Sequence, residues 1–472
     1  MFLGRRSEQE LLERKYEGGN FEFAVIYGRR RVGKTALIEK FCEGKKAVFF
    51  TARRTNQRTN LKILDSTVRK VLGEEEQEKR NGENTSPEDP DADRIFGRIA
   101  EAAGSERIVL VIDEFPNLAE TDPGISDSLQ VFIDHYFRKT KLFLILCGSS
   151  MSFMEEQILG AKSPLYGRCT IRLKIRPMDY YESALFFPER SPSEKAEIYG
   201  AVGGIPMYLT MFSDMTSSVP HLISENFLQT GSVLSYEPEN LLMQEMKDPK
   251  KYTAVIEAVA EGRARISEIS SKTGISPVDV TRAIDDLIAL DYVVKVTPIN
   301  EPGTRKTRYF LKDNLFRFYY SNIFGKEDLL KGRTEEETER NISSILPHYT
   351  GKIFEDMAAG YIRRFLGYGD IGKWWGTSKN SRTSEEIDIV ARRKTLSGKT
   401  EGLFAECKFR NEPMTIDVLF RLEDRAADVR GFDSKEFALF SKSGFSDELK
   451  DQAEREGVVL VELKDMYMNR TE

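Results

Sequence analysis

The chain has 472 residues, of which 40% are hydrophobic and 31% charged, and its formal net charge is −6 at pH 7. This length exceeds what one hydrophobic core usually supports, so we expect roughly two to four domains. The acidic balance excludes a surface that attracts nucleic acid everywhere, although it leaves room for a local basic site. No apolar run approaches the roughly 18 residues of a membrane helix, and no apolar segment begins the chain. These features predict a cytoplasmic protein without a membrane partner.

Four cysteines are scattered along the chain, with neither the paired spacing of a zinc site nor the density of a disulfide scaffold. We expect free thiols at Cys42, Cys147, Cys169 and Cys407.

The first half of the chain alternates between short apolar runs and helical patterns. The helical patterns include Lys34–Glu43 and Ser128–Arg138. Runs without polar alternation are typical of strands that are buried on both faces of a parallel sheet. Strands of this kind are predicted at Phe23–Ile26, Ala47–Thr51, Ile108–Ile112 and Leu142–Leu146. The alternation favours a doubly wound α/β layer.

An acidic, proline-containing stretch interrupts this layer at Glu74–Asp93. It holds almost no apolar residues, so we expect a disordered surface insertion; an interaction segment is the alternative.

After about residue 250, short helices give way to two strands. Helices are predicted at Tyr252–Ala260 and Ile266–Lys272, and a third begins where Ser276 caps Pro277 at the first helical position. Two strands, Tyr292–Val296 and Thr307–Leu311, then flank a loop. Three helices followed by a hairpin predict a winged helix.

The loop after the first predicted strand has the spacing GxxxxGK[ST], and a predicted helix follows it. Glycines let the backbone bend so that its N–H groups and the helix N-terminus surround phosphates. Lys34 would reach the β- and γ-phosphates of ATP, and the Thr35 hydroxyl would bind Mg²⁺. The residues predicted to hold the nucleotide here are Gly28, Arg29, Arg30, Arg31, Val32, Gly33, Lys34, Thr35 and Ala36.

A second part of this site is predicted where strand Ile108–Ile112 runs into Asp113 and Glu114. Open α/β sheets bind ligands at the carboxyl ends of their strands. Asp113 would complete the Mg²⁺ shell, and Glu114 would orient the attacking water. Together with the phosphate loop, these residues predict an enzyme that hydrolyses ATP.

Two further residues have competing interpretations. Ser149, after strand Leu142–Leu146, would sense the γ-phosphate, or it forms a plain turn. Arg168 would reach the nucleotide of a second copy as an arginine finger, or it is a surface arginine. The first alternative for Arg168 implies a homo-oligomer.

These motifs resemble the archaeal P-loop ATPases of the AAA+/STAND type. Phe2-Leu3-Gly4-Arg5 with Glu8 is similar to their box before the first strand, and the resemblance places Gly4 and Arg5 near the adenine. Gly203-Gly204-Ile205-Pro206 resembles the GxP box of their helical lid, which implies that Pro206 approaches the base. The same family implies a winged helix after the lid.

The C-terminal part is similar to PD-(D/E)XK nucleases, through Glu355 on a helix, the pair Trp374-Trp375, Asp388, and the run Glu406-Cys407-Lys408. On a strand, Glu406 and Lys408 share a face, because side chains alternate with a period of two. The resemblance implies that Glu355, Asp388 and Glu406 hold a metal ion and that Lys408 steadies either the phosphoryl oxyanion or the attacking water.

DNA contact by the winged helix is one of two alternatives. Its third helix carries three aspartates, which oppose phosphate, so Arg305, Lys306 and Arg308 on the wing are better candidates. The other alternative is a lid or protein-docking element.

The predicted fold class is therefore α/β: a P-loop parallel sheet with a helical lid, a winged helix, and a small α/β domain resembling restriction endonucleases. The expected domains are 1–245 for the ATPase core and lid, 246–312 for the winged helix, 313–345 for an aromatic and charged linker, and 346–472 for the nuclease-like domain. Two functions fit this organisation. One is an ATP-driven machine that acts on nucleic acid, and the other is a nucleotide-controlled switch whose C-terminal domain only docks partners.

Overall fold

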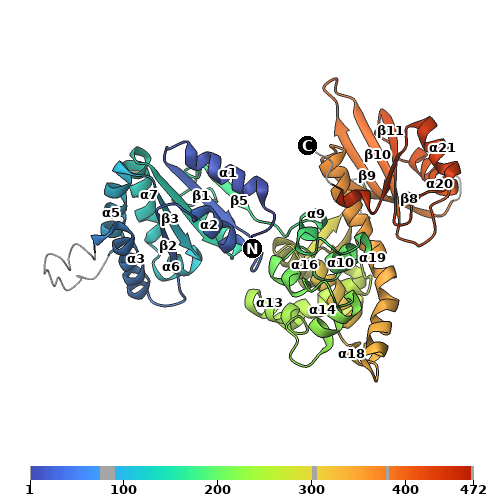
Figure 1. Ribbon diagram of the computed structural model, residues 1–472, viewed down its shortest axis with the longest axis horizontal. Coiled ribbons are helices and arrows are strands. Elements are labelled where there is room, and N and C mark those ends of the chain that lie inside the picture. Colours follow the sequence, from blue (N-terminus) through green and yellow to red (C-terminus); the bar gives the residue numbers. More distant parts are fainter. Residues whose placement is uncertain (1, 75–90, 300–305, 379–381, 469–472) are drawn as a thin grey trace. The chain divides into compact units, whose positions relative to one another are not determined.

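The computed structural model describes residues 2–74, 91–299, 306–378 and 382–468 (Figure 1). The chain divides into two compact units, Met1–Pro177 and Met178–Glu472. Within the described ranges, no helix combines the length and the apolar character that crossing a membrane requires. All four cysteines are free thiols.

The first unit contains a five-stranded parallel sheet in the order β2-β3-β4-β1-β5. The central strands β1, β3 and β4 are buried along their whole length, which explains their uninterrupted apolar sequences. The five strands are β1 (Glu22–Tyr27), β2 (Ala47–Thr51), β3 (Ile108–Asp113), β4 (Leu142–Gly148) and β5 (Ile171–Lys174).

Helices cover both faces of this sheet (Figure 1). On one face, Phe41 of α2 packs edge-to-face against Tyr16 of α1 and contacts Phe143 of β4. The other face carries a large apolar core from α3, α5, α6 and α7. The helical segments of this unit are α1 (Arg6–Glu17), α2 (Lys34–Cys42), α3 (Gln57–Leu72), α5 (Ala92–Ser105), α6 (Phe115–Thr121), α7 (Ile125–His135), η1 (Phe137–Lys139), α8 (Met151–Phe153) and η2 (Met154–Ile158).

The four predicted strands of this unit are confirmed, and the structure adds β5 at the sheet edge. Most of the acidic stretch Glu74–Asp93 lies outside the described residues. At its end, the Asp91 side chain accepts a hydrogen bond from the Arg94 N–H, so helix α5 already begins at Ala92. The expected disorder therefore does not extend to Asp93.

The second unit begins with short helices. Ser191 starts α10 with a capping box that includes Glu194. The helical segments up to the winged-helix region are α9 (Tyr180–Ser183), η3 (Ala184–Phe186), α10 (Pro192–Val202), α11 (Pro206–Met211), α12 (Val219–Ile223), η4 (Ser224–Leu228) and α13 (Glu237–Glu245). Residues 178–245, which we expected to belong with the ATPase core, are grouped with the second unit.

Three helices and a hairpin follow, in the order expected for a winged helix. The Ser276 side chain caps α16 by accepting from the Asp279 N–H, as its sequence predicted. The segments are α14 (Pro249–Ala260), α15 (Ile266–Thr273), α16 (Pro277–Ala289), and the antiparallel strands β6 (Val293–Val296) and β7 (Arg308–Leu311).

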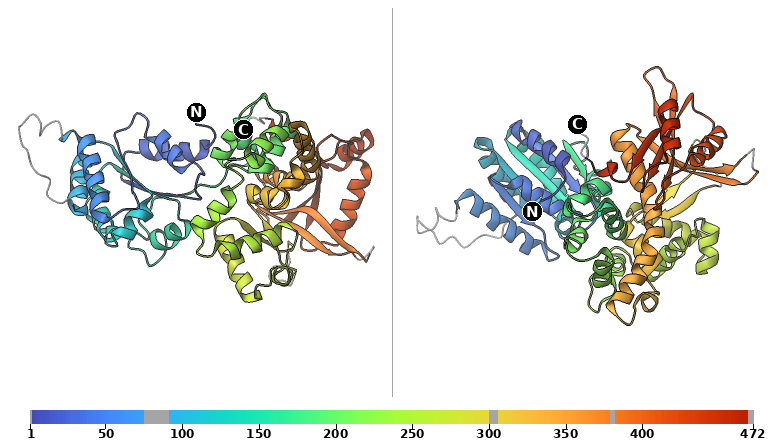
Figure 2. Two further views of the ribbon diagram at one scale, coloured as in Figure 1. Left: turned by 90° about the horizontal axis from the view of Figure 1, so that it is seen from below. Right: turned by 45° about the vertical axis from the view of Figure 1, so that its right-hand side comes forward.

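The segment 313–345, expected as a linker, is largely helical. Asp313 and Thr334 provide side-chain caps for α17 and α19, respectively. The segments are α17 (Asn314–Phe318), the π-helix η5 (Tyr319–Ile323), α18 (Glu327–Leu330) and α19 (Glu335–Phe365). Figure 2 shows α19 running from the helical part of this unit to its sheet.

The chain ends in a five-stranded mixed sheet in the order β12-β11-β10-β9-β8. Helix α19 lies on one face, where Phe354 contacts Phe409 and Tyr361 contacts Phe440. Helices α20 and α21 form an apolar core on the other face. The segments are β8 (Asp370–Thr377), β9 (Ser384–Lys394), β10 (Thr400–Lys408), α20 (Ile416–Ala427), β11 (Ser434–Ser441), α21 (Asp447–Glu456), β12 (Val459–Glu462) and η6 (Asp465–Tyr467).

The glycine pair before α11 fits a close approach of two backbone segments. The Met178 N–H donates to the Gly204 carbonyl at 2.8 Å. A Cβ atom at Gly204 would lie 1.8 Å from the Met178 carbonyl oxygen, so only glycine fits there. Pro206 then begins α11 at its first position.

We expect Gly204→Ala to destabilise the second unit by about 3 kcal/mol, because backbone atoms of Met178 must move to admit the methyl group. The only two tryptophans, Trp374 and Trp375, both lie in this unit, so urea unfolding followed by tryptophan fluorescence measures its stability selectively. Gly369→Ala is the control, because an added Cβ meets nothing there. Equal midpoints for the two variants would contradict the prediction.

Candidate functional site

The predicted phosphate loop connects β1 to α2 in the first unit. Gly33 caps α2 with φ 93°, and Arg31 also has a positive φ of 65°. A Cβ atom at Gly28 would lie 2.2 Å from the carbonyl oxygen of Ile175, so the loop passes too close to the chain after β5 for any side chain. The loop thus directs the N-terminus of α2 to the carboxyl edge of the sheet, where its free N–H groups favour an anion.

Lys34 lies inside this loop with only 6% of its surface exposed. Its Nζ donates to the carbonyl oxygens of Gly28 and Arg29 at 2.9 and 3.0 Å. Burial lowers the pKa of Lys34, and the neighbouring acidic groups Cys147, Glu114 and Asp113 act against this shift. The loop therefore concentrates one buried cation next to two carboxylates.

Thr35 and Asp113 meet across the sheet edge. The Thr35 Oγ1 donates to the Asp113 Oδ2 at 3.2 Å, and the other oxygen of Asp113 accepts from the Glu114 N–H at 3.0 Å. Asp113 is buried, with 3% of its surface exposed. A hydroxyl and a carboxylate that converge in this way are oxygen donors suited to Mg²⁺. The two predicted metal-binding residues are thus brought together.

Glu114 is held in an unusual conformation beside Ser149. Its φ of 50° lies in the left-handed region, which is costly for a residue with a side chain. Its Oε2 accepts a hydrogen bond from the Ser149 Oγ at 2.9 Å. The structure thus brings Ser149, at the end of β4, to the carboxylate that we expected to orient water.

The N-terminal box is connected to the phosphate loop through Arg5. This arginine is 4% exposed, and its guanidinium donates to the Val32 carbonyl at 3.1 Å and to the Arg176 carbonyl. Its backbone caps α1, directly after Gly4, and both residues have positive φ. Arg5 therefore supports the loop, while the predicted adenine contact of Gly4 and Arg5 stays a prediction.

Arg168 has a structural role in the first unit. Its guanidinium forms a bidentate pair with Asp134, at 2.6 to 3.0 Å, and donates to the carbonyl of Pro164 at 2.8 Å. These contacts occupy the group that we considered as an arginine finger. Pro206 lies in the second unit, and its predicted approach to the base stays a prediction.

The predicted nuclease-like residues lie around the centre of the C-terminal sheet. Glu355 of α19 pairs with Lys373 of β8. The Asp388 Oδ2 of β9 accepts from the Cys407 N–H at 3.0 Å. Among the described residues, the carboxylate oxygens of Glu355, Asp388 and Glu406 do not gather within 4.8 Å of one another, whereas the group His221, Glu335 and Glu339 does.

Glu406 on β10 is neutralised by two cations of the protein. Its Oε1 accepts from Lys408 Nζ at 2.6 Å, and its Oε2 lies 3.3 Å from an Arg425 nitrogen. That Oε2 is buried and accepts no well-aligned hydrogen bond within the described part of the chain. Two of the three carboxylates predicted to hold metal therefore already have cationic partners, and this arrangement does not fit a preformed metal centre.

The protonation of Asp388 is affected by its burial near Glu406 and Glu355. Burial raises the pKa of this carboxyl to about 7, and the charges of Glu406 and Glu355 add to the shift. The pairing of β8 with β9 is also irregular here. Gly372 pairs with Val390 and Trp374 pairs with Ile387, so a span of three residues on β9 faces a span of two residues on β8, which is a β-bulge. This bulge interrupts the regular alternation of side chains along β9 next to Asp388.

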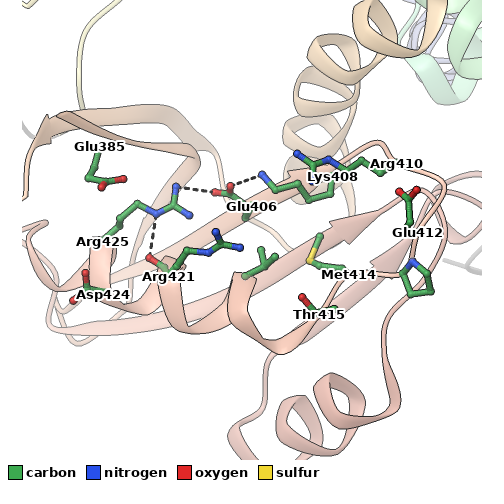
Figure 3. Close-up of a pocket in the computed structure, with 12 residues that line it drawn as sticks. Glu385, Glu406, Lys408, Arg410, Glu412, Met414, Thr415, Arg421, Asp424 and Arg425 are labelled. Atoms are coloured by element: carbon green, nitrogen blue, oxygen red, sulfur yellow. Dashed lines mark hydrogen bonds and ion pairs between the residues drawn. The ribbon is translucent and has the colours of Figure 1, made fainter. Parts of the chain in front are cut away.

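Sequence reasoning missed the arginines of α20 that line a pocket of about 620 Å³ next to Glu406 (Figure 3). Arg421 and Arg425 are four residues apart, so they project from the same side of the helix. The Arg425 guanidinium also donates to the Glu386 carbonyl at 2.6 Å. The spacing of these arginines on a strongly amphipathic helix is the signal that could have found them.

The wing of the predicted winged helix contacts the C-terminal sheet. The Arg308 guanidinium lies over the ring of Trp375, at 4.4 Å from its centroid, and 3.4 Å from Glu386. Next to it, the Ile299 N–H donates to the Lys373 carbonyl at 2.9 Å. Arg305 lies outside the described residues. Arg308, predicted as a DNA contact, is thus engaged within the protein.

The parallel sheet, the glycine loop and the Thr35–Asp113 contact define a P-loop ATPase. Residues 2–212 match the family of ATPase domains found predominantly in Archaea, and residues 316–423 match archaeal and bacterial proteins of unknown function. The chain is 31% identical over 453 residues to an uncharacterized protein of Methanocaldococcus jannaschii, which covers 94% of this chain and 96% of that protein. It belongs to this family of archaeal ATPases.

Other similarities are more partial. A stretch of 46 residues, 10% of this chain and 78% of the relative, is 54% identical to an uncharacterized ATP-binding protein of M. jannaschii. Among solved structures, a Walker-type ATPase of Pyrococcus abyssi is similar with a TM-score of 0.49 and 20% identity, over 68% of this chain and 96% of that chain. The ORC2 protein of Aeropyrum pernix, solved as ADPNP and ADP complexes, is similar with a TM-score of 0.44 and 15% identity, over 72% and 94% of the two chains.

We expect Lys34→Ala to weaken ATP binding at least about 100-fold, because the substitution removes the buried cation of the loop. Titration calorimetry with a non-hydrolysable ATP analogue measures the effect. Lys40→Ala is the matched control, because Lys40 lies on the same helix but pairs with Glu43 at the surface. An unchanged affinity in Lys34→Ala would place the nucleotide elsewhere.

Proposed function

We propose that the chain hydrolyses ATP with Mg²⁺ in the first unit and couples this turnover to nucleic acid that the C-terminal domain contacts. The observation that carries the ATPase part is the hydrogen bond between Thr35 and Asp113, with Glu114 next in the chain. These residues come from α2 and from the end of β3, two elements that a P-loop sheet brings to one edge.

Each residue of the site has a distinct task in this proposal. Lys34 and the loop N–H groups bind the β- and γ-phosphates, and Thr35 and Asp113 hold the Mg²⁺ shell. The metal ion, when bound, offsets charge on the phosphate oxygens. Glu114 orients the water that attacks the γ-phosphorus, while the bond to the β-phosphate oxygen breaks. Ser149 positions the Glu114 carboxylate through their hydrogen bond.

The nucleic-acid part of the proposal is supported by the charged pocket beside β10. Its lining carries the cations Lys408, Arg410, Arg421 and Arg425 and the carboxylates Glu385, Glu406, Glu412 and Asp424, and Lys408 and Arg425 pair with Glu406. Arg410 and Arg421 form no ion pair within the described part of the chain, so they are the groups through which this pocket would contact a phosphate. Cleavage of a strand by Asp388, Glu406 and Lys408 stays a prediction.

A second candidate function is a nucleotide-controlled switch whose C-terminal domain docks partners without cleaving them. The neutralisation of Glu355 by Lys373 and of Glu406 by Lys408 and Arg425 favours it. In that case ATP turnover resets a binding state, and nucleic acid has no effect on the rate of hydrolysis.

We expect Glu114→Gln to retain ATP binding and to lower the rate of hydrolysis at least about 100-fold, because an amide cannot accept the proton of the attacking water. Single-turnover phosphate release separates this step from binding. Glu120→Gln on the exposed side of α6 removes the same charge nearby and should hydrolyse normally. A variant Glu114→Gln with wild-type turnover would assign the water to another residue.

The two candidate functions differ in how ATPase activity responds to DNA. We expect single-stranded, duplex or branched DNA to stimulate phosphate release severalfold, because coupling requires that bound nucleic acid alter the ATPase cycle. Indifference to all three favours the switch. In parallel, DNA and RNA are incubated with Mg²⁺ or Mn²⁺ and compared between wild type and Asp388→Ala. Metal-dependent cuts that disappear in the variant would establish cleavage, and the absence of cuts in both proteins favours binding alone.

A further inference from the structure

A concentration of positive charge lies on the first unit, in the segment that joins β2 to α3 (Figure 1). Between Thr51 and Leu64 the sequence contains four basic residues and no aspartate or glutamate. All four basic side chains are exposed, and they belong to Arg53, Arg54, Arg58 and Lys62. We refer to these four residues as the β2–α3 basic surface.

The acidic residues next to this surface do not neutralise it. Asp65, the next acidic residue along α3, is buried and pairs with Arg98 of α5. Glu120 is the only acidic residue of α6, and within the described part of the chain it forms no ion pair with Arg53 or Arg54. Neither of these two arginines pairs with any other carboxylate of that part. The other two basic residues of the surface interact elsewhere in the chain, so Arg53 and Arg54 are the groups available to a ligand.

The backbone of this segment is held in place by a buried asparagine. The Asn60 side chain is fully buried, accepts from the Arg53 N–H at 3.0 Å and donates to the Arg53 carbonyl at 3.0 Å. The Thr55 N–H donates to the same carbonyl at 2.9 Å. The Asn56 side chain then caps α3 by accepting from the Thr59 N–H. Because the backbone is fixed, less conformational freedom is lost when a ligand binds the two arginine side chains.

The same segment is connected to the nucleotide site. The Ala52 N–H donates to the Asp113 carbonyl at 2.9 Å, and the Ala52 carbonyl accepts from the Asn117 Nδ2 at 3.1 Å. Asn117 lies in α6, and its N–H donates to the Glu114 carbonyl at 2.9 Å. Arg53 is therefore one residue away from hydrogen bonds that reach both acidic residues of the site.

The composition of the surface favours the phosphate backbone of a nucleic acid over a protein partner. Guanidinium groups form bidentate hydrogen bonds with phosphate oxygens. From Thr51 to Leu64, all of which the structure describes, no large apolar side chain is exposed, whereas protein interfaces usually have an apolar or aromatic centre. The segment also contains no aromatic residue on which an unpaired base could stack, so a duplex fits better than a single strand.

We propose that the β2–α3 basic surface binds the phosphate backbone of duplex DNA and that this contact raises the rate of ATP hydrolysis. A phosphate that shifts Arg53 also shifts the Ala52 carbonyl, to which Asn117 donates. The displacement then reaches Glu114, which orients the attacking water in the proposed mechanism. This contact lies on the ATPase unit itself, so it deepens the proposed function and rests on its coupling of ATP turnover to nucleic acid.

Anisotropy of a short fluorescein-labelled DNA duplex, titrated with the full chain and a non-hydrolysable ATP analogue, measures this contact. We expect Arg53→Ala and Arg54→Ala each to weaken binding about tenfold, because each removes a charge-assisted hydrogen bond to phosphate. Each should also lower the slope of log affinity against log salt by about 1. Lys70→Ala is the control, because it removes an exposed positive charge from the same helix, about 18 Å along the axis from Arg58, and it should bind normally.

Single-turnover phosphate release with and without the duplex tests the coupling. Stimulation relative to each protein's own rate without DNA should be severalfold in the wild type and should be lost when Arg53 and Arg54 are both replaced by alanine. Asn117→Ala should bind the duplex like the wild type but show no stimulation, because its hydrogen bond to the Ala52 carbonyl is absent. A role of Asn117 in folding alone would instead weaken binding of the ATP analogue, which titration calorimetry measures for every variant.

Four results would overturn the inference. The first is unchanged duplex binding when Arg53 and Arg54 are both replaced by alanine. The second is tighter binding of a single strand than of the duplex through these arginines, and the third is full stimulation in Asn117→Ala. The fourth is binding of polyglutamate in place of DNA by the same arginines, which would assign the surface to an acidic protein.

The same measurements separate this inference from the proposed function. If no DNA binds the wild type or changes its rate of hydrolysis, the nucleic-acid part of the proposed function fails as well. If a duplex binds and stimulates the wild type and the Arg53 and Arg54 variants alike, the contact lies in the C-terminal domain, and only the present inference fails.

Discussion

The position of β4 between β1 and β3 governs the nucleotide site. Neighbouring strands lie about 4.8 Å apart, so Asp113 at the end of β3 is two strands away from the phosphate loop after β1. The first turn of α2 reaches across that gap, and its Thr35 side chain donates a hydrogen bond to Asp113. The intervening strand places Ser149 against Glu114. One topological choice thus brings Thr35, Asp113, Glu114 and Ser149 together at one edge of the sheet.

In the C-terminal sheet the dominant constraint is the cost of burying like charges. The carboxylates of Glu355, Asp388 and Glu406 come from three elements, and their charges are not all compensated in the same way. Glu355 and Glu406 have cationic partners, whereas the Asp388 carboxylate accepts from the Cys407 N–H and has a pKa raised by burial. This distribution shows why a motif that resembles a metal-dependent nuclease does not by itself define a metal centre.

The parts of the fold that were predictable from sequence are those whose burial is uniform. The runs Ile108–Ile112 and Leu142–Leu146 could be assigned because strands buried on both faces need no polar residues. In contrast, β5 has only four residues, of which Arg172 is exposed, so its sequence shows no clear run of apolar residues. The start of α19 was missed because Glu335, Glu336 and Glu337 are charged, although they favour a helix N-terminus electrostatically.

The features of the candidate sites also differ in how far they could be predicted from the sequence. The phosphate loop is local in sequence, so its glycines and Lys34 could be identified from spacing alone. The contacts of Arg425 with Glu406 and of Arg308 with Trp375 join residues far apart in the chain, and no local pattern encodes them. The bulge at Asp388 is equally invisible, because it depends on how β8 pairs with β9.

The contact between the wing and β8 has a thermodynamic consequence. Lys373 accepts the Ile299 N–H with its backbone and pairs with Glu355 through its side chain, so one residue belongs to both the wing and the acidic centre. A ligand that displaced the wing and shifted Lys373 with it would change the free energy of the Glu355 charge. By reciprocity, a ligand that engaged Glu355 would then alter the contact between the wing and β8 by the same free energy.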